Sequence, residues 1–205
     1  MPRLVVLVSG GGRSLANLIE RTRLAPGDPK RLACEIVLVI ASRDCKAVGI
    51  AERAGIEAAI LSGEIPAEAL GERLTRAGAE LVVLAGYLRK LHVPRGYEGR
   101  VLNIHPALLP AFGGPGMYGQ HVHEAVLESH RRTGRPTDSG CTVHVVTEGY
   151  DEGPIIAQAR CPIEPGDTPE TLAARVFTLE LETYPRAIAA FLAALPGREA
   201  SAERL

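Results

Sequence analysis

Two polar side chains interrupt an otherwise apolar segment between Val101 and Pro110. Asn103 and His105 are two residues apart in the run V-L-N-I-H, so they share one face of a strand, which Pro106 ends. In a parallel sheet, ligands bind at the carboxyl ends of the strands. An Asn amide beside an imidazole offers two hydrogen-bond donors to a developing oxyanion. The pattern indicates a catalytic site; the structural alternative is a buried Asn and His satisfied by backbone groups.

A third candidate is Asp151, in the turn-like segment Asp151-Glu152-Gly153-Pro154 that precedes an apolar strand. A carboxylate near His105 would favour the imidazolium form of that ring. It could also take up a proton directly or through water. Asp is common in turns because it hydrogen-bonds its own backbone, so a purely structural role is the alternative.

A glycine loop, Ser9-Gly10-Gly11-Gly12-Arg13-Ser14, joins the first expected strand to the first expected helix. Its backbone N–H groups and the helix dipole would point at an anion such as a phosphate. A dinucleotide fingerprint would need glycine at Leu15, and a P-loop would need Gly-Lys-Ser or Gly-Lys-Thr. Both cofactor interpretations are therefore weakened, and a purely conformational loop is the alternative.

The elements that must position these residues alternate between strand and helix in the first half of the chain. Hydrophobic periodicity predicts parallel strands at Leu4–Val8, Glu35–Ile40, Ala58–Leu61, Leu81–Ala85 and Val101–Ile104. Helices are expected between them at Ser14–Arg23, Lys46–Ala54 and Pro66–Ala77. This order predicts a doubly wound sheet with right-handed crossovers.

The second half changes character. We expect a helix at His121–Ser129, a basic turn at Arg131–Arg135, neighbouring strands at Cys141–Val146 and Ile155–Pro162, and a final helix from Thr168 to about Leu195. Pro185 should kink that helix or split it in two. The predicted fold class is a single α/β domain over residues 1–195, Rossmann-like and mostly parallel, with an antiparallel C-terminal extension. Residues 196–205 should form a frayed tail.

Composition excludes several classes of function. The 23 Lys and Arg residues nearly cancel the 24 Asp and Glu residues, so the chain lacks the charge of a nucleic-acid binder. No apolar stretch reaches transmembrane length and no signal peptide is evident, which predicts a cytoplasmic protein without a membrane partner. The four cysteines have no CxxC spacing and should be small core residues without disulfides. We expect no metal, because Cys141 and His144 diverge on a strand and His121 and His123 diverge on a helix.

The motifs N-I-H-P-A-L-L-P, beginning at Asn103, and D-E-G-P-I-I, beginning at Asp151, are similar in order and separation to the two signatures of the folate-dependent formyltransferases. The resemblance runs from Leu4 to about Leu195. It is closest to the members that formylate glycinamide ribonucleotide from 10-formyltetrahydrofolate in purine synthesis. Formyl transfer needs a neutral amine, stabilisation of a negative oxygen and a route for a proton. The resemblance assigns stabilisation of the negative oxygen to Asn103 and His105, and the route for the proton to Asp151.

The resemblance also implies where the two substrates bind. His144, on the strand face opposite Cys141 and Val143, would support the site, although a hydrogen-bonded core histidine is the alternative. The nucleotide would contact Gly12, Arg13, Ser14 and Glu180. The folate would contact Leu88, Arg89, Lys90, Leu91, Asn103, Thr147, Glu148, Gly149, Tyr150 and Asp151.

Two positions and one segment depart from the family pattern. Arg13 replaces a small polar residue in the phosphate loop and could add a cation to the phosphate or point into solvent, and Ala67 stands where the family commonly has a ligand-binding Arg. The glycine-rich segment 112–119 is longer than the typical form, which suggests a mobile flap over the bound nucleotide; a rigid glycine-rich turn is the alternative.

Other functions stay open. Within the same fold, a formyltetrahydrofolate hydrolase or another formyltransferase would fit the signatures. From a different class, a nucleotide-binding regulatory protein would explain the glycine loop but would leave Asn103, His105 and Asp151 without a role. The expected partners are small-molecule substrates, and the chain should be a monomer or a homodimer.

Overall fold

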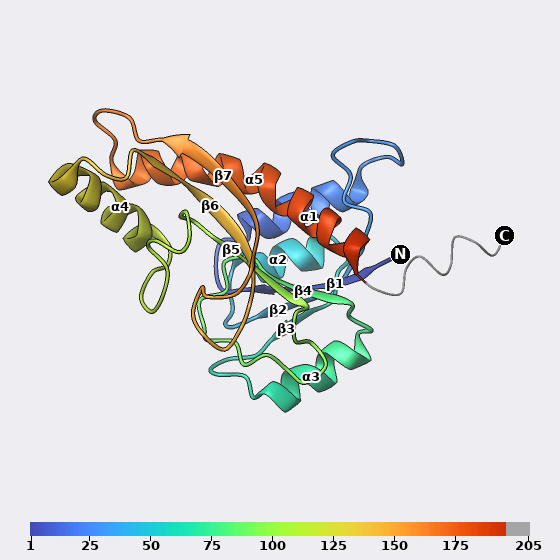
Figure 1. Cartoon of the computed structure of the whole chain (residues 1–205). Helices are drawn as coiled ribbons and strands as arrows, with labels where there is room; N and C mark the ends of the chain where they lie inside the picture. Colours follow the sequence, from blue (N-terminus) through green and yellow to red (C-terminus); the bar gives the residue numbers. More distant parts are fainter. Residues whose placement is uncertain (196–205) are drawn as a thin grey trace.

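The computed structural model describes residues 1–195, and the expected tail at 196–205 lies outside the described residues. Seven strands form one sheet in the order β3-β2-β1-β4-β5-β6-β7 (Figure 1). The pairings from β1 to β5 are parallel, and those of β5 with β6 and of β6 with β7 are antiparallel. The predicted fold class, a doubly wound parallel sheet with an antiparallel C-terminal extension, is confirmed.

The helices and strands lie close to the expected positions. Along the chain they are β1 (Arg3–Val8), α1 (Arg13–Arg23), β2 (Glu35–Ala41), α2 (Lys46–Arg53), β3 (Ala58–Ile60), α3 (Ala67–Arg76), β4 (Leu81–Leu84), β5 (Val101–His105), α4 (Gln120–Thr133), β6 (Asp138–Val145), β7 (Ile155–Pro162) and α5 (Pro169–Ala194).

The sheet separates two apolar cores, because successive side chains of a strand point to opposite faces. On one face Leu4 and Val6 of β1 pack in a cluster with residues of α1, α2 and α5. On the other face Val5 and Leu7 pack in a second cluster that includes Leu70 of α3. All four β1 side chains are fully buried. Burial on both faces explains why the strands are continuous apolar runs in the sequence.

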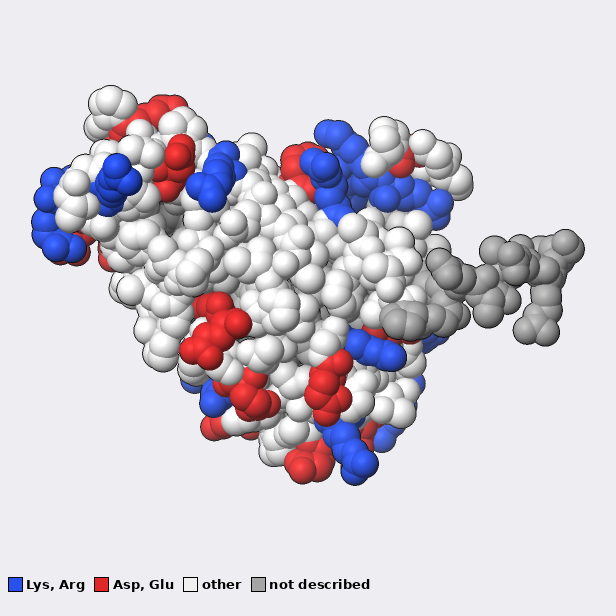
Figure 2. Space-filling model, in the orientation of Figure 1, with Lys and Arg blue, Asp and Glu red and all other residues white. Residues whose placement is uncertain are grey.

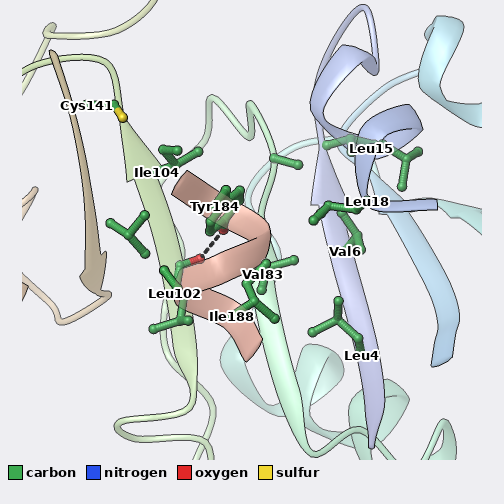
Figure 3. Close-up of a cluster of buried hydrophobic side chains, with 14 of the residues drawn as sticks. Leu4, Val6, Leu15, Leu18, Val83, Leu102, Ile104, Cys141, Tyr184 and Ile188 are labelled. Carbon is green, nitrogen blue, oxygen red and sulfur yellow. Dashed lines mark hydrogen bonds between the residues drawn. The ribbon is translucent and has the colours of Figure 1, made fainter. Parts of the chain in front are cut away.

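Tyr184 joins α5 to the centre of the sheet. Its hydroxyl lies 3.0 Å from the carbonyl oxygens of both Leu84 in β4 and Leu102 in β5, and Figure 3 shows the contact with Leu102. A phenol carries one proton, so it donates to one carbonyl at a time. The contact holds α5 against β4 and β5, the two strands that lead to the candidate site.

Two expected boundaries were wrong. Helix α4 continues to Thr133, through the start of the basic turn expected at Arg131–Arg135. Gly134, in the left-handed conformation with φ 71°, ends the helix. The cations in the last turn of α4 interact favourably with the helix dipole. Strand β6 begins at Asp138 instead of Cys141, because Asp138 pairs with Pro162 in the antiparallel ladder.

Of the two outcomes expected at Pro185, the structure contradicts the split, because α5 is one helix through that residue; a kink stays a prediction. Proline has no N–H for the carbonyl four residues earlier, which belongs to Leu181. That carbonyl accepts a hydrogen bond from Asn17 Nδ2 of α1 at 2.8 Å. A tertiary contact thus satisfies the group that the proline leaves free, and the helix continues.

The glycine loop contains one position that only glycine fits. Gly12 has φ +73°, and a Cβ there would lie 2.9 Å from Cα and Cβ of Ala47 and from Cδ1 of Ile50. A Cβ at Gly11 would meet no atom within 4 Å. Gly12 is therefore required for packing against α2, whereas Gly11 leaves open space beside the loop.

We predict that Gly12→Ala lowers the free energy of unfolding by about 2–4 kcal/mol, from left-handed strain and overpacking. The control variant Gly11→Ala should change it by less than about 1 kcal/mol. Urea unfolding of both variants measures the difference. Equal losses would contradict this account of the loop.

Candidate active site

The predicted catalytic residues meet where the sheet changes from parallel to antiparallel. Asn103 and His105 occupy the end of β5, and Asn103 faces His144 across the antiparallel pairing with β6. Asn103 Nδ2 lies 3.1 Å from His144 Nε2, and His144 Nδ1 lies 3.0 Å from the Val145 carbonyl. The carbonyl can only accept, so His144 Nδ1 carries a proton. Its Nε2 accepts from the Asn103 amide when the ring is neutral and donates to Asp151 when the ring is protonated. The second N–H of that amide remains available.

Asp151 reaches this point from the loop between β6 and β7, with φ +57° in the left-handed region. Its Oδ2 accepts a hydrogen bond from Gly114 N at 3.0 Å and lies 3.6 Å from His105 Nδ1. Its Oδ1 lies 3.4 Å from His144 Nε2. Burial raises the pKa of this carboxyl, but hydrogen bonding with His144, the charge of His105 and the Gly114 N–H outweigh burial. The net pKa lies below the ordinary 3.8, so Asp151 is ionised at neutral pH.

His105 is 3% exposed, and its Nε2 lies 2.7 Å from the carbonyl oxygen of Phe112, to which it donates. Burial lowers the pKa of this ring, and Asp151 and the Phe112 carbonyl raise it by less. The net pKa lies below 6.5, so His105 is neutral near pH 7. Asp151 thus favours the imidazolium form, as the sequence indicated, but removing the ring from water has the larger and opposite effect.

Two residues that the sequence did not single out hold the segment that follows β5. Thr142 Oγ1 of β6 donates to the Ala107 carbonyl at 2.7 Å and accepts from Leu109 N at 3.0 Å. Gln158 Nε2 of β7 lies 2.9 Å from the carbonyl of Leu109 and 2.9 Å from Thr142 Oγ1. Thr142 lies two residues before His144 on the same face of β6. This spacing is the sequence signal that could have identified Thr142.

The same segment then turns back over the catalytic side chains. Phe112 (φ +56°) presents its carbonyl to His105, and Gly114 donates to Asp151. A Cβ at Gly113 would lie 2.6 Å from Leu109 Cδ2 and 3.2 Å from Asp151 Cβ. The first three residues of the expected flap are thus anchored to the site. Mobility of the remaining residues, 115–119, stays a prediction.

All the predicted site residues line one cavity of about 500 Å³. The nucleotide set (Gly12, Arg13, Ser14 and Glu180) and the folate set (Leu88, Arg89, Lys90, Leu91, Asn103, Thr147, Glu148, Gly149, Tyr150 and Asp151) both surround it, as do His105 and His144. Buried His123 of α4 also lines the cavity, and sequence reasoning had considered it only as an unsuitable zinc ligand. Ala67 is not among the lining residues.

One end of the cavity suits an anion. Helix α1 begins after Gly12 with no side-chain cap and no acidic residue in its first turn, so its first N–H groups have no helical partner. The Arg13 guanidinium lies over the Phe177 ring, 3.9 Å from its centroid. Beside them is Glu180, whose pKa burial raises to about 7 against the opposing charge of Arg13.

The other end suits a flat ring. Ser9 Oγ accepts a hydrogen bond from Leu88 N at 2.9 Å, which ties the segment 86–91 to the glycine loop. Leu88 and Tyr150 are exposed at 47% and 44%, and Lys90 Nζ lies 5.8 Å from the Tyr150 ring centroid. These apolar faces have no protein partner on the cavity side, which is typical of a ligand pocket.

Within residues 1–195, no group of three or more His, Cys, Asp or Glu side chains could hold a metal ion. None of the helices in that range is long and apolar enough to cross a membrane. On the face drawn in Figure 2, basic side chains fall into separate groups with acidic side chains nearby and form no continuous basic surface.

Residues 2–188 match the model of the formyl transferase family, and the chain belongs to that family. It is 34% identical to phosphoribosylglycinamide formyltransferase of Escherichia coli K12, over 92% of this chain and 86% of that protein. It is 39% identical to the chloroplastic phosphoribosylglycinamide formyltransferase of Arabidopsis thaliana, of which it spans 64%. A trifunctional purine biosynthetic protein of Drosophila pseudoobscura is 41% identical, and the chain spans 13% of its length.

Solved structures agree with this assignment. The glycinamide ribonucleotide transformylase 1 of Symbiobacterium toebii has a TM-score of 0.81 and 37% identity, over 97% of this chain and 92% of that one. The phosphoribosylglycinamide formyltransferase of Brucella melitensis has a TM-score of 0.79 and 39% identity, over 95% and 97%. Membership of the family implies a folate-type one-carbon donor.

We predict that Glu180→Gln raises the free energy of unfolding at pH 8 by about 2 kcal/mol and changes it little at pH 4. The folded pKa is raised from 4.5 to about 7, so the favourable neutral form is lost as pH rises through 7. Glutamine carries no charge, so it removes the cost of holding an ionised carboxyl at this buried position. The control is Glu182→Gln on the same helix, where hydrogen bonding to Arg21 lowers the carboxyl pKa. Glu182→Gln should lower the free energy of unfolding slightly at pH 8. A gain in this control variant would contradict the assignment of the pH 8 effect to Glu180.

Proposed function

We propose that this protein transfers the formyl group of 10-formyltetrahydrofolate to the amine of 5'-phosphoribosylglycinamide, a step of purine biosynthesis. One observation carries the proposal: Asn103, His105 and Asp151 line the same cavity as the anion-binding start of α1 and the apolar segment 88–91. That arrangement suits a reaction between a phosphorylated amine and a large flat donor. The names of the related proteins support the same formyl acceptor, and membership of the formyl transferase family supports a folate-type donor.

The substrates are assigned to the two ends by chemistry. The phosphate of the nucleotide suits the first N–H groups of α1 at Gly12, Arg13 and Ser14. The ribose hydroxyls suit the carboxyl of Glu180. The folate would lie against Leu88–Leu91 and Thr147–Asp151, and it supplies the formyl group. No metal enters the proposal.

The roles of the catalytic side chains follow from their hydrogen bonds. Asn103 keeps an amide N–H for the negative oxygen that develops as the amine attacks the formyl carbon. His105 Nε2 donates a hydrogen bond to the Phe112 carbonyl oxygen, and Nδ1 faces Asp151. We therefore assign to His105 and Asp151 together the proton that leaves the amine, since a proton on Nδ1 would be stabilised by the carboxylate 3.6 Å away. The bond from the formyl carbon to the donor nitrogen breaks, and that nitrogen takes up a proton.

The proposal extends to the setting of the protein. Its partners would be the two small-molecule substrates, without nucleic acid or membrane, and it would act in the cytoplasm as a monomer or homodimer.

The test is a formyl-transfer assay with both substrates, followed by folate absorbance. We predict that His105→Ala and Asp151→Asn each lower kcat by about a hundredfold or more, because each removes a proton acceptor or its partner. Asp151→Asn keeps the side-chain shape, so folate affinity should stay within about threefold. The surface variant Glu35→Gln is the control.

Two results would contradict the proposal. One is no transfer by the folded wild-type protein. The other is a near-normal kcat in a folded His105→Ala variant, which would remove this ring from the chemistry.

A further inference from the structure

Arg13 is a cation that lies over an aromatic ring and makes no ion pair within the described residues. Its guanidinium lies 3.9 Å from the Phe177 ring centroid. Arg13 belongs to the first turn of α1 and Phe177 to α5, and both side chains line the cavity. The ring therefore supports a charge at the cavity wall. The neighbouring carboxyl, Glu180, interacts with that charge but makes no ion pair with it, and burial raises the pKa of Glu180 to about 7.

The contact with the ring is made by the guanidinium carbon, and no described residue accepts a hydrogen bond from the N–H groups at the guanidinium edge. The five N–H donors of an arginine lie in the plane of the group, so an aromatic ring below the plane blocks none of them. Such an edge matches two oxygens of a phosphate. Holding the side chain in advance also reduces the entropy that binding would cost.

The surroundings favour a phosphate over other anions. The first turn of α1 has no acidic residue and no side-chain cap. Gly10 and Gly11 leave open space beside the loop, because a Cβ at either would meet no atom within 4 Å. Backbone donors and the Arg13 edge can thus share one anion with several oxygens.

We propose that Phe177 is a positioning residue that holds Arg13 at the anion end of the cavity, and that this pair selects a phosphorylated amine over the unphosphorylated one. The inference rests on the proposed function for the identity of the amine. Without a phosphate, the amine would leave the guanidinium and the α1 donors unpaired. The selectivity should therefore appear in the binding of the amine and leave the chemical step unchanged.

Three variants test the roles of Arg13 and Phe177, and a fourth is the control. Arg13→Gln removes the charge and keeps a polar side chain, and Phe177→Leu removes the ring and keeps apolar volume. Phe177→Tyr keeps an aromatic face and should behave like the wild type. The control Arg23→Gln makes the same change of charge in the last turn of α1, outside the cavity.

We expect Arg13→Gln to raise KM for glycinamide ribonucleotide about tenfold or more, with kcat changed by less than about threefold. Phe177→Leu should raise the same KM about threefold. The unphosphorylated glycinamide riboside should be used with unchanged kcat/KM by each variant. In the Arg13→Gln background, Phe177→Leu should add nothing, because the ring acts only through the guanidinium.

Calorimetry with inorganic phosphate gives an assay independent of catalysis. Its Kd should weaken about tenfold in Arg13→Gln and stay unchanged in Arg23→Gln. An unchanged Kd in Arg13→Gln, or a further loss from Phe177→Leu in that background, would overturn the inference. If the wild type binds phosphate through Arg13 but does not formylate the ribonucleotide, the proposed function fails and the anion site stands. If it formylates the ribonucleotide with no change in Arg13→Gln, the inference fails alone.

Discussion

The site is organised around one buried carboxylate. Removing an ionised group from water costs several kcal/mol unless charged or hydrogen-bonded partners replace the water. Asp151 finds its partners on three segments: His105 at the end of β5, His144 on β6 and the Gly114 N–H in the segment after β5. Each partner therefore fixes the position of its own segment relative to the others. The left-handed conformation of Asp151 is held by this set of contacts.

The sheet supplies these partners because it changes direction at β5. Parallel pairing with β4 places the end of β5 beside the segment 84–91, and antiparallel pairing with β6 places His144 opposite Asn103. The return from β6 to β7 then brings Asp151 back to the same point. A sheet that stayed parallel would have directed that return to the opposite edge. The antiparallel extension is thus the feature that brings the third catalytic candidate to the first two.

Local patterns predicted most of the fold, and the errors arose where distant contacts decide. The start of β6 at Asp138 depends on pairing with Pro162, and the continuity of α5 through Pro185 depends on Asn17 in α1. In the site, spacing alone indicated Asn103 and His105, whereas Asp151 needed the resemblance to a known family. Thr142 and Gln158 were missed because their partners belong to a loop with no regular pattern. The sequence indicated that Asp151 would raise the pKa of His105 but not that burial would lower it by more, because burial is a property of the folded chain.

The central claim is that Asp151 stabilises the protonated form of His105 although burial keeps that ring neutral near pH 7. An NMR titration of His105 in the wild type and in Asp151→Asn tests it most directly. The account predicts a wild-type pKa below 6.5, with the proton of the neutral ring on Nε2, and a still lower pKa in the variant, because the carboxylate raises it. A pKa that is unchanged or higher in Asp151→Asn would contradict the account.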